Sequence, residues 1–454
     1  MNLTDKKVVV VGLARSGASI ARFLSHQGAK VIVSDTKERG KLGGLPEAME
    51  KEGIALELGG HTTHTFETAN LVVLSPGVPH TSNPVKVARA AGIPVVGEVE
   101  LASRFIKAPV VAVTGTNGKT TTTSLISAML EASGKKVFTG GNIGTPLTEY
   151  IRTEQDADVV VVEISSFQLD TIETFRPKVA LLLNITDDHL DRYTDFNAYK
   201  RSKGRIFENQ QHDDIAILNT ADKEVADIRR VLQNRCLTIG GVGPNAAAVT
   251  KEQITIRTPE LPEVHIDLTQ STLVGHHNRE NIAVAALAAL TIGATPKGIQ
   301  KAVNTFKGLP HRIEYVSTVS GVRFYNDSKA TNIDAVEKAV TGFDNPIVVI
   351  MGGRYKGGRF TDLTDALKKR ARAIIAMGEA KKKIVSSLGL SLRVLEAESL
   401  DDAVDKAFSV AREGDSVVLS PACSSFDMFE NYGQRGDLFR LSVARLKGCQ
   451  KTDG

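Results

Sequence analysis

Short apolar runs alternate with amphipathic stretches from Val8 to about Glu98. The runs are rich in valine, and each ends in Gly, Asp or Ser, as in "VVVVG", "AKVIVSD" and "NLVVLSPG". Continuous apolar runs of this kind are typical of parallel strands that are covered by helices on both faces. The pattern therefore predicts a first α/β domain over residues 1–98.

A second series of runs begins at "PVVAVTG" and continues through "KVFTGGN", "DVVVVEISS", "KVALLLNITDDH" and "IAILNTAD". Each run stops at a polar cluster, and in a parallel sheet these stops share one edge, where ligands bind outside the carboxyl ends of the strands. The later segment "ITIRTPELPEVHIDL" alternates with a period of two and predicts a small antiparallel hairpin. A helix from Asn281 would close this second domain near Leu309, so it is predicted over residues 99–308.

The segment "GLPHR" marks the next boundary, because a third series of strand-like runs and helical patterns follows it. The runs are "VRFYNDS", "PIVVIMGG", "AIIAMGE", "RVLEA" and "SVVLSPA". This alternation predicts a third α/β domain over residues 309–454. Three domains also agree with the length of 454 residues, since ~150 residues per domain is usual.

Composition narrows the class of protein. The 56 basic and 52 acidic residues leave a formal charge of only +4, so we expect no nucleic-acid partner. Cys236, Cys423 and Cys449 form no CxxC pair and indicate reduced thiols. No segment reaches the ~18 consecutive apolar residues of a membrane span, and "KKVVVVG" predicts a strand rather than a signal peptide. We therefore expect a cytoplasmic protein.

The first candidate site is the glycine turn from Gly12 to Gly17, which follows the first predicted strand. It matches the dinucleotide fingerprint GxGxxG except that Ala14 replaces the second glycine. Asp35 ends the next strand, at the distance where a ribose contact is expected. The turn either binds a nucleotide diphosphate at the N-terminus of a helix or is a tight strand-to-helix turn without a ligand.

The second candidate site is a stronger phosphate-binding signal. Residues 115–120 read "GTNGKT" after an apolar strand and before a helix, which is the context of a P-loop, although Val113 stands where the first glycine belongs. Backbone N–H groups of such a loop surround phosphates, Lys119 would reach the β and γ phosphates, and the Thr120 hydroxyl would bind Mg²⁺. The predicted fold class is thus α/β, with a Rossmann-like N-terminal domain, a central P-loop ATPase-type domain with a parallel sheet, and a Rossmann-like C-terminal domain.

Two further residues lie at the same predicted sheet edge. Glu163 ends the run "VVVVE" and would be an oxygen ligand of Mg²⁺, or else a surface loop residue. His189 follows another predicted strand, among three aspartates, and is either structural or part of the site. By spacing alone, the lysines of "YKRSKGRIFEN" are interpreted as solvated charges on a helix.

Several motifs together resemble the Mur ligase family. They are "GTNGKT", "EISSFQL", "NITDDHLDRY" and "NDSKATN", and the resemblance covers nearly the whole chain. Mur ligases are cytoplasmic enzymes that use ATP to form amide bonds in bacterial peptidoglycan synthesis. "NDSKATN" and "SPACSSFDMF" are similar to those members that add D-glutamate to UDP-N-acetylmuramoyl-L-alanine. The resemblance implies that the first glycine turn holds the UDP group and the second holds ATP, and that the reaction passes through an acyl phosphate.

The resemblance also implies roles for individual residues. ATP, with Mg²⁺ at two sites, would be held by Gly115, Thr116, Asn117, Gly118, Lys119, Thr120, Thr121, Asn278, Asn281, Arg312 and Asp327. Metal ligands would be Thr120, Glu163, His189 and Lys203, where Lys203 matches a lysine that these enzymes carbamylate with CO₂. The UDP-sugar substrate would contact Arg15, Ser16, Asp35, Thr36, Asn142 and Ser165, and D-glutamate would contact Lys329, Thr331, Lys356, Ser425 and Tyr432. Lys119, His189, Lys203 and Lys329 would be catalytic.

Three other classes of protein remain alternatives at the level of sequence. An NAD-linked oxidoreductase would use the first turn but leaves Lys119, Thr120 and Glu163 without a role. A P-loop switch or motor would use the second turn but leaves the polar motifs of the third domain unexplained. Folate-polyglutamate ligases share the ATP loop but lack a UDP-binding first domain. We expect a monomer.

Overall fold

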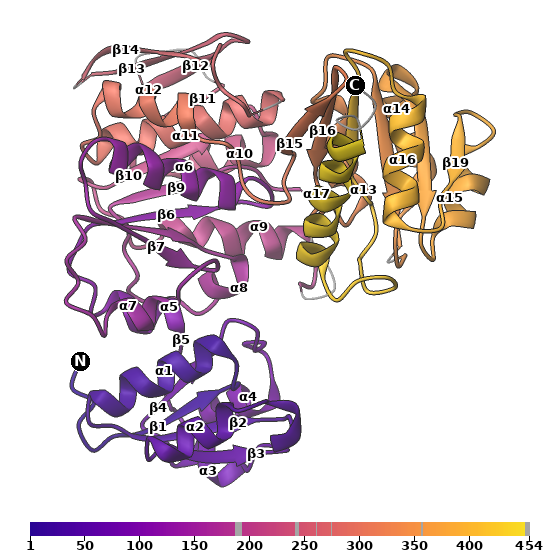
Figure 1. The fold of residues 1–454 in the computed structure, drawn as a ribbon. Helices are drawn as coiled ribbons and strands as arrows, with labels where there is room; N and C mark the ends of the chain where they lie inside the picture. Colours follow the sequence, from indigo (N-terminus) through magenta and orange to yellow (C-terminus); the bar gives the residue numbers. More distant parts are fainter. Residues whose placement is uncertain (187–192, 241–244, 260, 274, 356, 450–454) are drawn as a thin grey trace. The chain divides into compact units, whose positions relative to one another are not determined.

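The computed structural model describes residues 1–186, 193–240, 245–259, 261–273, 275–355 and 357–449 (Figure 1). The chain divides into two compact units. The first contains residues 1–269 and 280–303, and the second contains residues 270–279 and 304–454. Three β-sheets lie within the described residues, so the α/β class with three sheets is confirmed.

The first sheet has the strand order β3-β2-β1-β4-β5, and its paired strands are all parallel. The valine run of β1 is buried on both faces because alternate residues of a strand point to opposite sides. Val8 and Val10 join a core with Phe23, whereas Val9 and Val11 pack with Phe66. The elements of this region are β1 (Lys7–Val11), α1 (Arg15–His26), β2 (Lys30–Asp35), α2 (Leu45–Lys51), β3 (Ala55–Leu58), α3 (Thr63–Glu67), β4 (Leu71–Leu74), α4 (Asn83–Ala90) and β5 (Val95–Gly97).

The second sheet has the order β14-β13-β12-β11-β10-β9-β6-β8-β7 within the described part of the chain. It is parallel from β7 to β12, and the predicted hairpin is present as the antiparallel pair β13–β14. Its strands are β6 (Val110–Thr114), β7 (Val137–Gly141), β8 (Val159–Glu163), β9 (Val179–Leu182), β10 (Ile215–Asn219), β11 (Arg235–Ile239), β12 (Ala246–Val249), β13 (Gln253–Thr258) and β14 (Leu261–Asp267). Because β6 lies between β9 and β8, the loops after these three strands meet at one edge.

Eight α-helices precede, connect or follow the strands of the second sheet in the described residues. They are α5 (Glu98–Ser103), α6 (Lys119–Ala132), α7 (Leu147–Tyr150), α8 (Ser166–Leu169), α9 (Phe196–Gly204), α10 (Lys223–Val231), α11 (His276–Thr291) and α12 (Pro296–Thr305). Helix α11 begins at His276, five residues before the start that the sequence predicted. Within the described residues, no helix combines the length and apolar composition needed to cross a bilayer.

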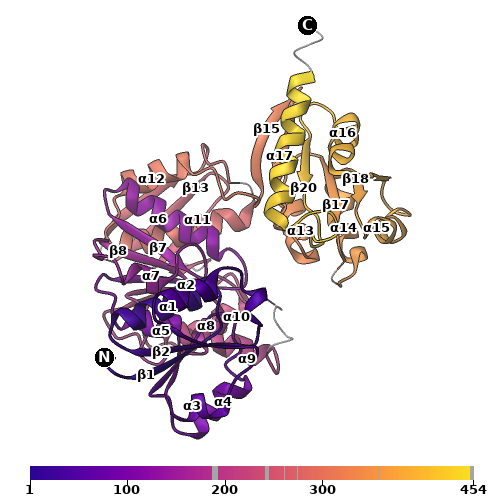
Figure 2. The same ribbon diagram turned by 60° about the horizontal axis from the view of Figure 1, so that its bottom comes forward.

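The third sheet has the order β15-β16-β20-β17-β18-β19 in the described residues, and only β15 runs antiparallel to its neighbour. Its strands are β15 (Glu314–Val319), β16 (Val322–Asn326), β17 (Ile347–Gly352), β18 (Ala371–Met377), β19 (Val394–Glu396) and β20 (Ser416–Leu419). Helices cover both of its faces (Figure 2). Helices α13 (Ile333–Thr341), α14 (Thr364–Arg370) and α15 (Lys381–Leu388) pack in one core, and α16 (Leu400–Val410) and α17 (Tyr432–Cys449) pack in the other.

Each compact unit contains a buried cysteine thiol. Cys236 lies on β11 in the first unit, and burial raises the pKa of its thiol. Cys423 lies four residues after β20 in the second unit and is fully buried. Neither forms a disulfide, in agreement with the reduced thiols that the sequence indicated.

Candidate active site

The loop with the predicted phosphate contacts joins β6 to α6 at the carboxyl edge of the second sheet. Gly115 and Gly118 have φ angles of +152° and +84°, a region that favours glycine. A Cβ atom on Gly118 would stand 2.6 Å from Oδ1 of Asn281. The Lys119 ammonium donates to the carbonyl oxygens of Gly115 and Thr116, each at 3.0 Å. The loop therefore places a cation beside the N–H groups of the first turn of a helix, as an anion site requires.

Asn184 binds this loop to the end of β9 through hydrogen bonds. The sequence alone assigned no role to this residue. Its side chain accepts from the N–H of Asn117 at 2.8 Å and donates to the carbonyl of the same residue at 3.1 Å. Its own carbonyl accepts from the N–H of Thr116 at 2.9 Å. The Tyr199 hydroxyl lies 3.2 Å from Oγ1 of Thr116. The signals of Asn184 in the sequence were its position at the polar end of an apolar run and its place as the first residue of "NITDDHLDRY", which assigned it no role.

The predicted adenine-side residues lie on α11. The Thr122 hydroxyl of α6 donates to Oδ1 of Asn281 at 3.3 Å, which brings this helix against the loop. Asn278 is buried one turn earlier on α11. Thr120 is half-buried in the first turn of α6, and Thr121 beside it is buried.

Glu163 ends β8 and is only 2 % exposed. Its Oε1 accepts from Nδ2 of Asn142 at 2.8 Å, whereas its Oε2 is buried and has no hydrogen-bond donor among the residues that the structure describes. A buried carboxylate oxygen without a donor is costly unless a cation satisfies it. Glu163 thus fits a Mg²⁺ ligand, since this ion prefers oxygen donors. Ser165 caps α8 through a capping box with Gln168.

Lys203 lies on α9 and is 2 % exposed. Its ammonium donates to the carbonyl of Gly115 at 2.8 Å and lies 4.6 Å from the centre of the Tyr199 ring. Lys200 on the same helix instead pairs with acidic residues at its surface, so the two lysines have different environments. His189, the other predicted metal ligand of this region, lies outside the described residues.

The first glycine turn lies between β1 and α1. Gly12 has a φ of +93°, and a Cβ on Gly17 would stand 1.8 Å from the carbonyl oxygen of Gly12, so only glycine fits there. Asp35 shapes the turn, because its carboxylate accepts from the N–H of Leu13 at 2.6 Å and of Lys37 at 2.8 Å. The remaining predicted contacts surround the turn: Arg15 and Thr36 are exposed, and Ser16 is half-buried.

The second compact unit holds the other predicted residues. Asp327 follows β16 and is buried, where its carboxylate accepts from the Ser420 hydroxyl at 2.9 Å and from the N–H of Ile313 at 3.2 Å. Burial raises the pKa of Asp327 to about 7, although these donors and the charge of Arg312 oppose the shift.

The predicted amino-acid contacts come from three segments of this unit. Lys329 and Thr331 follow β16, Ser425 follows β20 and is 2 % exposed, and Tyr432 begins α17. The Lys329 ammonium lies 5.2 Å from the centre of the Tyr432 ring. Lys356, predicted for the same pocket, lies outside the described residues.

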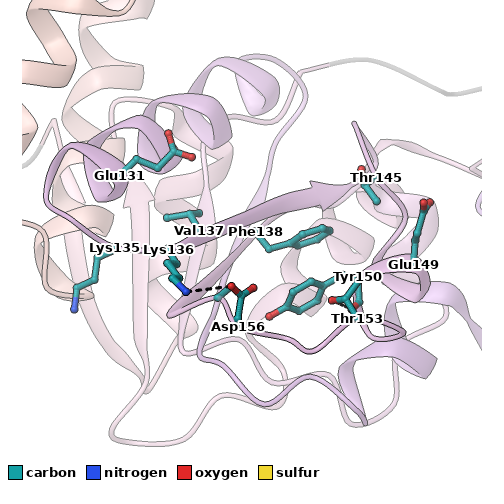
Figure 3. A pocket seen from close by; sticks show the side chains of 11 residues that line it. Glu131, Lys135, Lys136, Val137, Phe138, Thr145, Glu149, Tyr150, Thr153 and Asp156 are labelled. Carbon is teal, nitrogen blue, oxygen red and sulfur yellow. Dashed lines mark hydrogen bonds and ion pairs between the residues drawn. The ribbon is translucent and has the colours of Figure 1, made fainter.

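A separate pocket of about 610 Å³ flanks the edge strand β7 (Figure 3). The rings of Phe138 and Tyr150 stack in it with centres 4.2 Å apart, and Lys136 pairs with Asp156 at 3.2 Å. None of the predicted site residues lines this pocket. It therefore forms no part of the candidate active site.

The site combines a loop that requires glycine, a lysine whose ammonium contacts the carbonyls of that loop, and a buried carboxylate at the end of the neighbouring strand. These features define a P-loop nucleotide-binding α/β protein. The chain belongs to the Mur ligase family. The family model of the MurD-like N-terminal domain matches residues 6–97, that of the Mur ligase middle domain matches residues 113–289, and that of the glutamate ligase domain matches residues 311–423.

Relatives match the chain over its whole length. The UDP-N-acetylmuramoylalanine–D-glutamate ligase of Desulfosudis oleivorans is 49% identical over 445 residues, which are 98% of this chain and 97% of that protein. The protein of the same name from Desulfatibacillum aliphaticivorans is 49% identical over 453 residues, 98% of this chain and 100% of that protein.

Solved structures show the same fold at low identity. A pseudomurein peptide ligase type C from Methanothermus fervidus covers 97% of this chain and all of its own, with a TM-score of 0.60 and 20% identity. The UDP-N-acetylmuramate-alanine ligase of Thermotoga maritima covers 98% of this chain and 100% of its own, with a TM-score of 0.58 and 19% identity.

Proposed function

We propose that the chain is an ATP-dependent ligase that joins D-glutamate to UDP-N-acetylmuramoyl-L-alanine in peptidoglycan precursor synthesis. The observation that carries this function is the 49% identity to ligases of this name over 98% of the chain. The products are the amide, ADP and phosphate. The geometry of the loop after β6 supports the use of ATP, because it combines the N–H groups of a helix N-terminus with a lysine.

The reaction needs ATP because a carboxylate is a poor acyl donor to an amine. Transfer of the γ-phosphoryl group to the carboxylate of the UDP substrate gives an acyl phosphate. The amine of D-glutamate attacks its carbonyl carbon, and the tetrahedral intermediate releases phosphate to form the amide. Both steps bring anions together, so positioning and charge neutralisation dominate catalysis. Lys119 would place its ammonium against the transferring phosphate oxygens.

Mg²⁺, when bound, would neutralise part of the phosphate charge. Glu163 would hold it through Oε2, which has no donor within the described part of the chain, together with Thr120, and we include His189 at a second metal position. We also propose that Lys203 forms a carbamate: the ammonium loses a proton, the free amine attacks the carbon of CO₂ through Nζ, and a second proton leaves, which gives an anionic carbamate. Burial favours the loss of the ammonium charge, and Mg²⁺ would pair with the negative charge of the carbamate.

The substrates would be divided among three domains. Residues 1–98 would bind the UDP group at the first glycine turn, through Arg15, Ser16, Asp35 and Thr36. Residues 99–308 would bind ATP and, through Asn142 and Ser165, the sugar-peptide part. Residues 309–454 would bind D-glutamate, and Arg312 and Asp327 would contact the nucleotide. Separate domains can enclose the acyl phosphate and exclude the water that would hydrolyse it.

The D-glutamate pocket would need donors for two carboxylates while the amine stays free to attack. Lys329 and Lys356 would supply cations, and Thr331, Ser425 and the start of α17 at Tyr432 would supply hydrogen bonds. We further propose that the protein is a cytoplasmic monomer that binds no nucleic acid.

A product assay tests the proposed function. The purified chain is incubated with ATP, Mg²⁺ and UDP-N-acetylmuramoyl-L-alanine, and with one amino acid at a time: D-glutamate, L-glutamate, D-aspartate, L-lysine or meso-diaminopimelate. We expect the amide product, identified by mass, and ADP release with D-glutamate alone. Equal ADP release without any amino acid, or an amide with another amino acid only, would overturn the assignment.

A further inference from the structure

Arg435 is the largest of the fully buried side chains in the described residues, with an exposure of 1 %. It lies in the first turn of α17, and its guanidinium donates only to neutral oxygen atoms. Nε donates to Oγ of Ser328 at 2.9 Å, and Nη2 donates to the Ser328 carbonyl at 2.8 Å. Both Nη atoms donate to the carbonyl of Cys423 at 3.2 Å.

The charge of Arg435 has no ion-pair partner among the described residues, although buried charges in proteins are nearly always paired. Asp427 acts on it only at longer range, and its own Oδ2 accepts from the N–H of Glu379 at 2.9 Å. The N-terminus of a helix is itself a positive environment. Burial lowers the pKa of Arg435 to about 10, so it stays protonated at neutral pH. Among the described residues, the buried charge of Arg435 therefore has no contacting carboxylate, and Asp427 offsets it only from a distance.

The three segments that meet at Arg435 are those that carry the predicted amino-acid contacts. Ser328 directly precedes Lys329, and Cys423 lies two residues before Ser425. The hydroxyl of Ser328 also donates to the carbonyl of Tyr432 at 2.8 Å, which connects the loop after β16 to the first residue of α17. A guanidinium is suited to this task, because its donors form a rigid planar fork.

We propose that Arg435 is a positioning and specificity-determining residue for the amino-acid substrate. It fixes the two loops that carry Lys329 and Ser425, and its buried charge favours an amino acid with two carboxylates over one whose side chain is neutral. The proposal rests on the proposed function, since it assigns selectivity to the D-glutamate pocket. The ligand class is thus an amino acid with a net negative charge.

Two substitutions at Arg435 and one at its neighbour test this inference. Arg435→Met removes the charge and keeps much of the volume, Arg435→Lys keeps the charge without the fork, and Ser328→Ala keeps the cation and removes one acceptor. The matched control is Arg445→Met, because Arg445 lies on the same helix but is 46% exposed and pairs with Asp405 at 2.7 Å. The measurements are kcat, the KM values for D-glutamate and ATP, and inhibition by D-glutamine, whose side chain is an uncharged amide.

If the loops of Lys329 and Ser425 are no longer fixed, the substrate loses a charged hydrogen bond, and such a loss typically corresponds to roughly a ten- to hundredfold change in binding. We therefore expect Arg435→Met to raise the KM for D-glutamate by roughly 10- to 100-fold while the KM for ATP stays within about threefold. Arg435→Lys and Ser328→Ala should show smaller increases. The preference for D-glutamate over D-glutamine should fall in Arg435→Met and persist in Arg435→Lys, and Arg445→Met should behave as wild type.

The outcomes separate this inference from the function on which it rests. A wild-type protein that ligates no D-glutamate overturns the proposed function and the role of Arg435 with it. An active wild type, with lower thermal stability but an unchanged D-glutamate KM and an unchanged preference over D-glutamine in the variants, overturns the role of Arg435 alone. If Arg435→Met does not fold, Arg435→Lys and Ser328→Ala decide the question by the same criterion.

Discussion

Glu98 and Glu100 lie two residues apart on α5, both buried, yet their pKa values shift in opposite directions. For Glu98, burial dominates over the hydrogen bonds from Thr148 and raises the pKa to about 6. For Glu100, burial also favours a higher pKa. Hydrogen-bond donors that include the N–H of Glu173 and the hydroxyl of Thr174 have the larger effect and lower the pKa. The balance between burial and hydrogen-bond donors, which for Glu100 include the Arg104 guanidinium, therefore decides the ionisation of each group.

The stability of the protein should depend on pH through Glu98. Its pKa rises from 4.5 to about 6 on folding, so the folded chain binds more protons than the unfolded chain between these values. Stability is therefore lost as pH increases through this window, by about 2 kcal/mol. Glu98→Gln should gain about that much in unfolding free energy relative to wild type between pH 4.5 and 7.5, as measured by urea denaturation.

Glu100→Gln is the matched control for this prediction. The folded-state pKa of Glu100 is lowered, so its stabilising effect is present above the unfolded-state value of 4.5 and is lost as pH falls through the folded-state value. Glu100→Gln should therefore lose stability at pH 7.5 and approach wild type in acid. Parallel pH profiles for the two variants would contradict both assignments.

Lys203 and Lys200 form a second matched pair, on α9. Lys203 is buried beside the P-loop, whereas Lys200 pairs with Glu224 at 2.6 Å and Asp227 at 3.3 Å. If Lys203 works as a carbamate, Lys203→Ala should be inactive and should partly recover in formate or acetate, which restore an oxygen ligand. Lys200→Ala should keep nearly normal turnover. ADP release assays with and without added carboxylate measure both, and full activity of Lys203→Ala would exclude the carbamate.

At the level of single residues, part of the candidate site could be predicted from the sequence. Lys119 follows one apolar run and Glu163 ends another, and strand ends of a parallel sheet share one edge, so the placement of both at the carboxyl ends of neighbouring strands was predictable. Asn184 and Arg435 were not found, because their roles depend on partners that are distant in the sequence. The contacts of Arg435 join residues 107 positions apart, which no local pattern encodes.

Among elements, the buried parallel strands were the most predictable. The runs that became β1, β6, β8, β9 and β17 are almost entirely apolar and rich in valine, leucine or isoleucine. The hairpin β13–β14 was predictable from its alternating pattern. The strand order was not predictable, because β8 follows β7 in the chain but separates it from β6 in the sheet. Short elements such as α8 were missed, since four residues carry no helical period.

Helix α6 offers a comparison between its two flanking glycines. Gly118 and Gly134 have φ angles of +84° and +85°, so alanine should cause similar backbone strain at both, about 1–2 kcal/mol. A Cβ on Gly118 meets Oδ1 of Asn281 at 2.6 Å, whereas a Cβ on Gly134 meets nothing within 4 Å. Gly118→Ala should therefore lose more thermal stability and also raise the KM for ATP, whereas Gly134→Ala should change stability alone. Equal effects of both substitutions on the KM would contradict the role of the loop.

For the whole molecule, three sheets do not mean three independent bodies. The first and second sheets lie in one compact unit and share one apolar core. The third sheet lies in the other unit. Within the first unit, the Ser19 hydroxyl of α1 lies 2.8 Å from that of Thr148 in α7. The sequence predicted the number of sheets from the repeating strand pattern, but the shared core depends on side chains that meet only after folding.

This division predicts that thermal unfolding is not a single two-state transition. Each unit has its own apolar core, so each should unfold with its own enthalpy. Differential scanning calorimetry should require two components, with a calorimetric enthalpy larger than the van't Hoff value. An ATP analogue should shift the component to which α6 belongs. One transition with equal enthalpies would show that the units unfold together.

The buried thiols of Cys236 and Cys423 allow the local opening of each unit to be measured separately. Because Cys236 and Cys423 are shielded in the native state, a thiol reagent reaches each only when the surrounding strands separate. In a Cys449→Ser background, the modification rate of each thiol, relative to that of an unfolded peptide, gives the free energy of the opening that exposes it. One labelling reaction, resolved by peptide mass, can thus follow both units at once without a foreign probe.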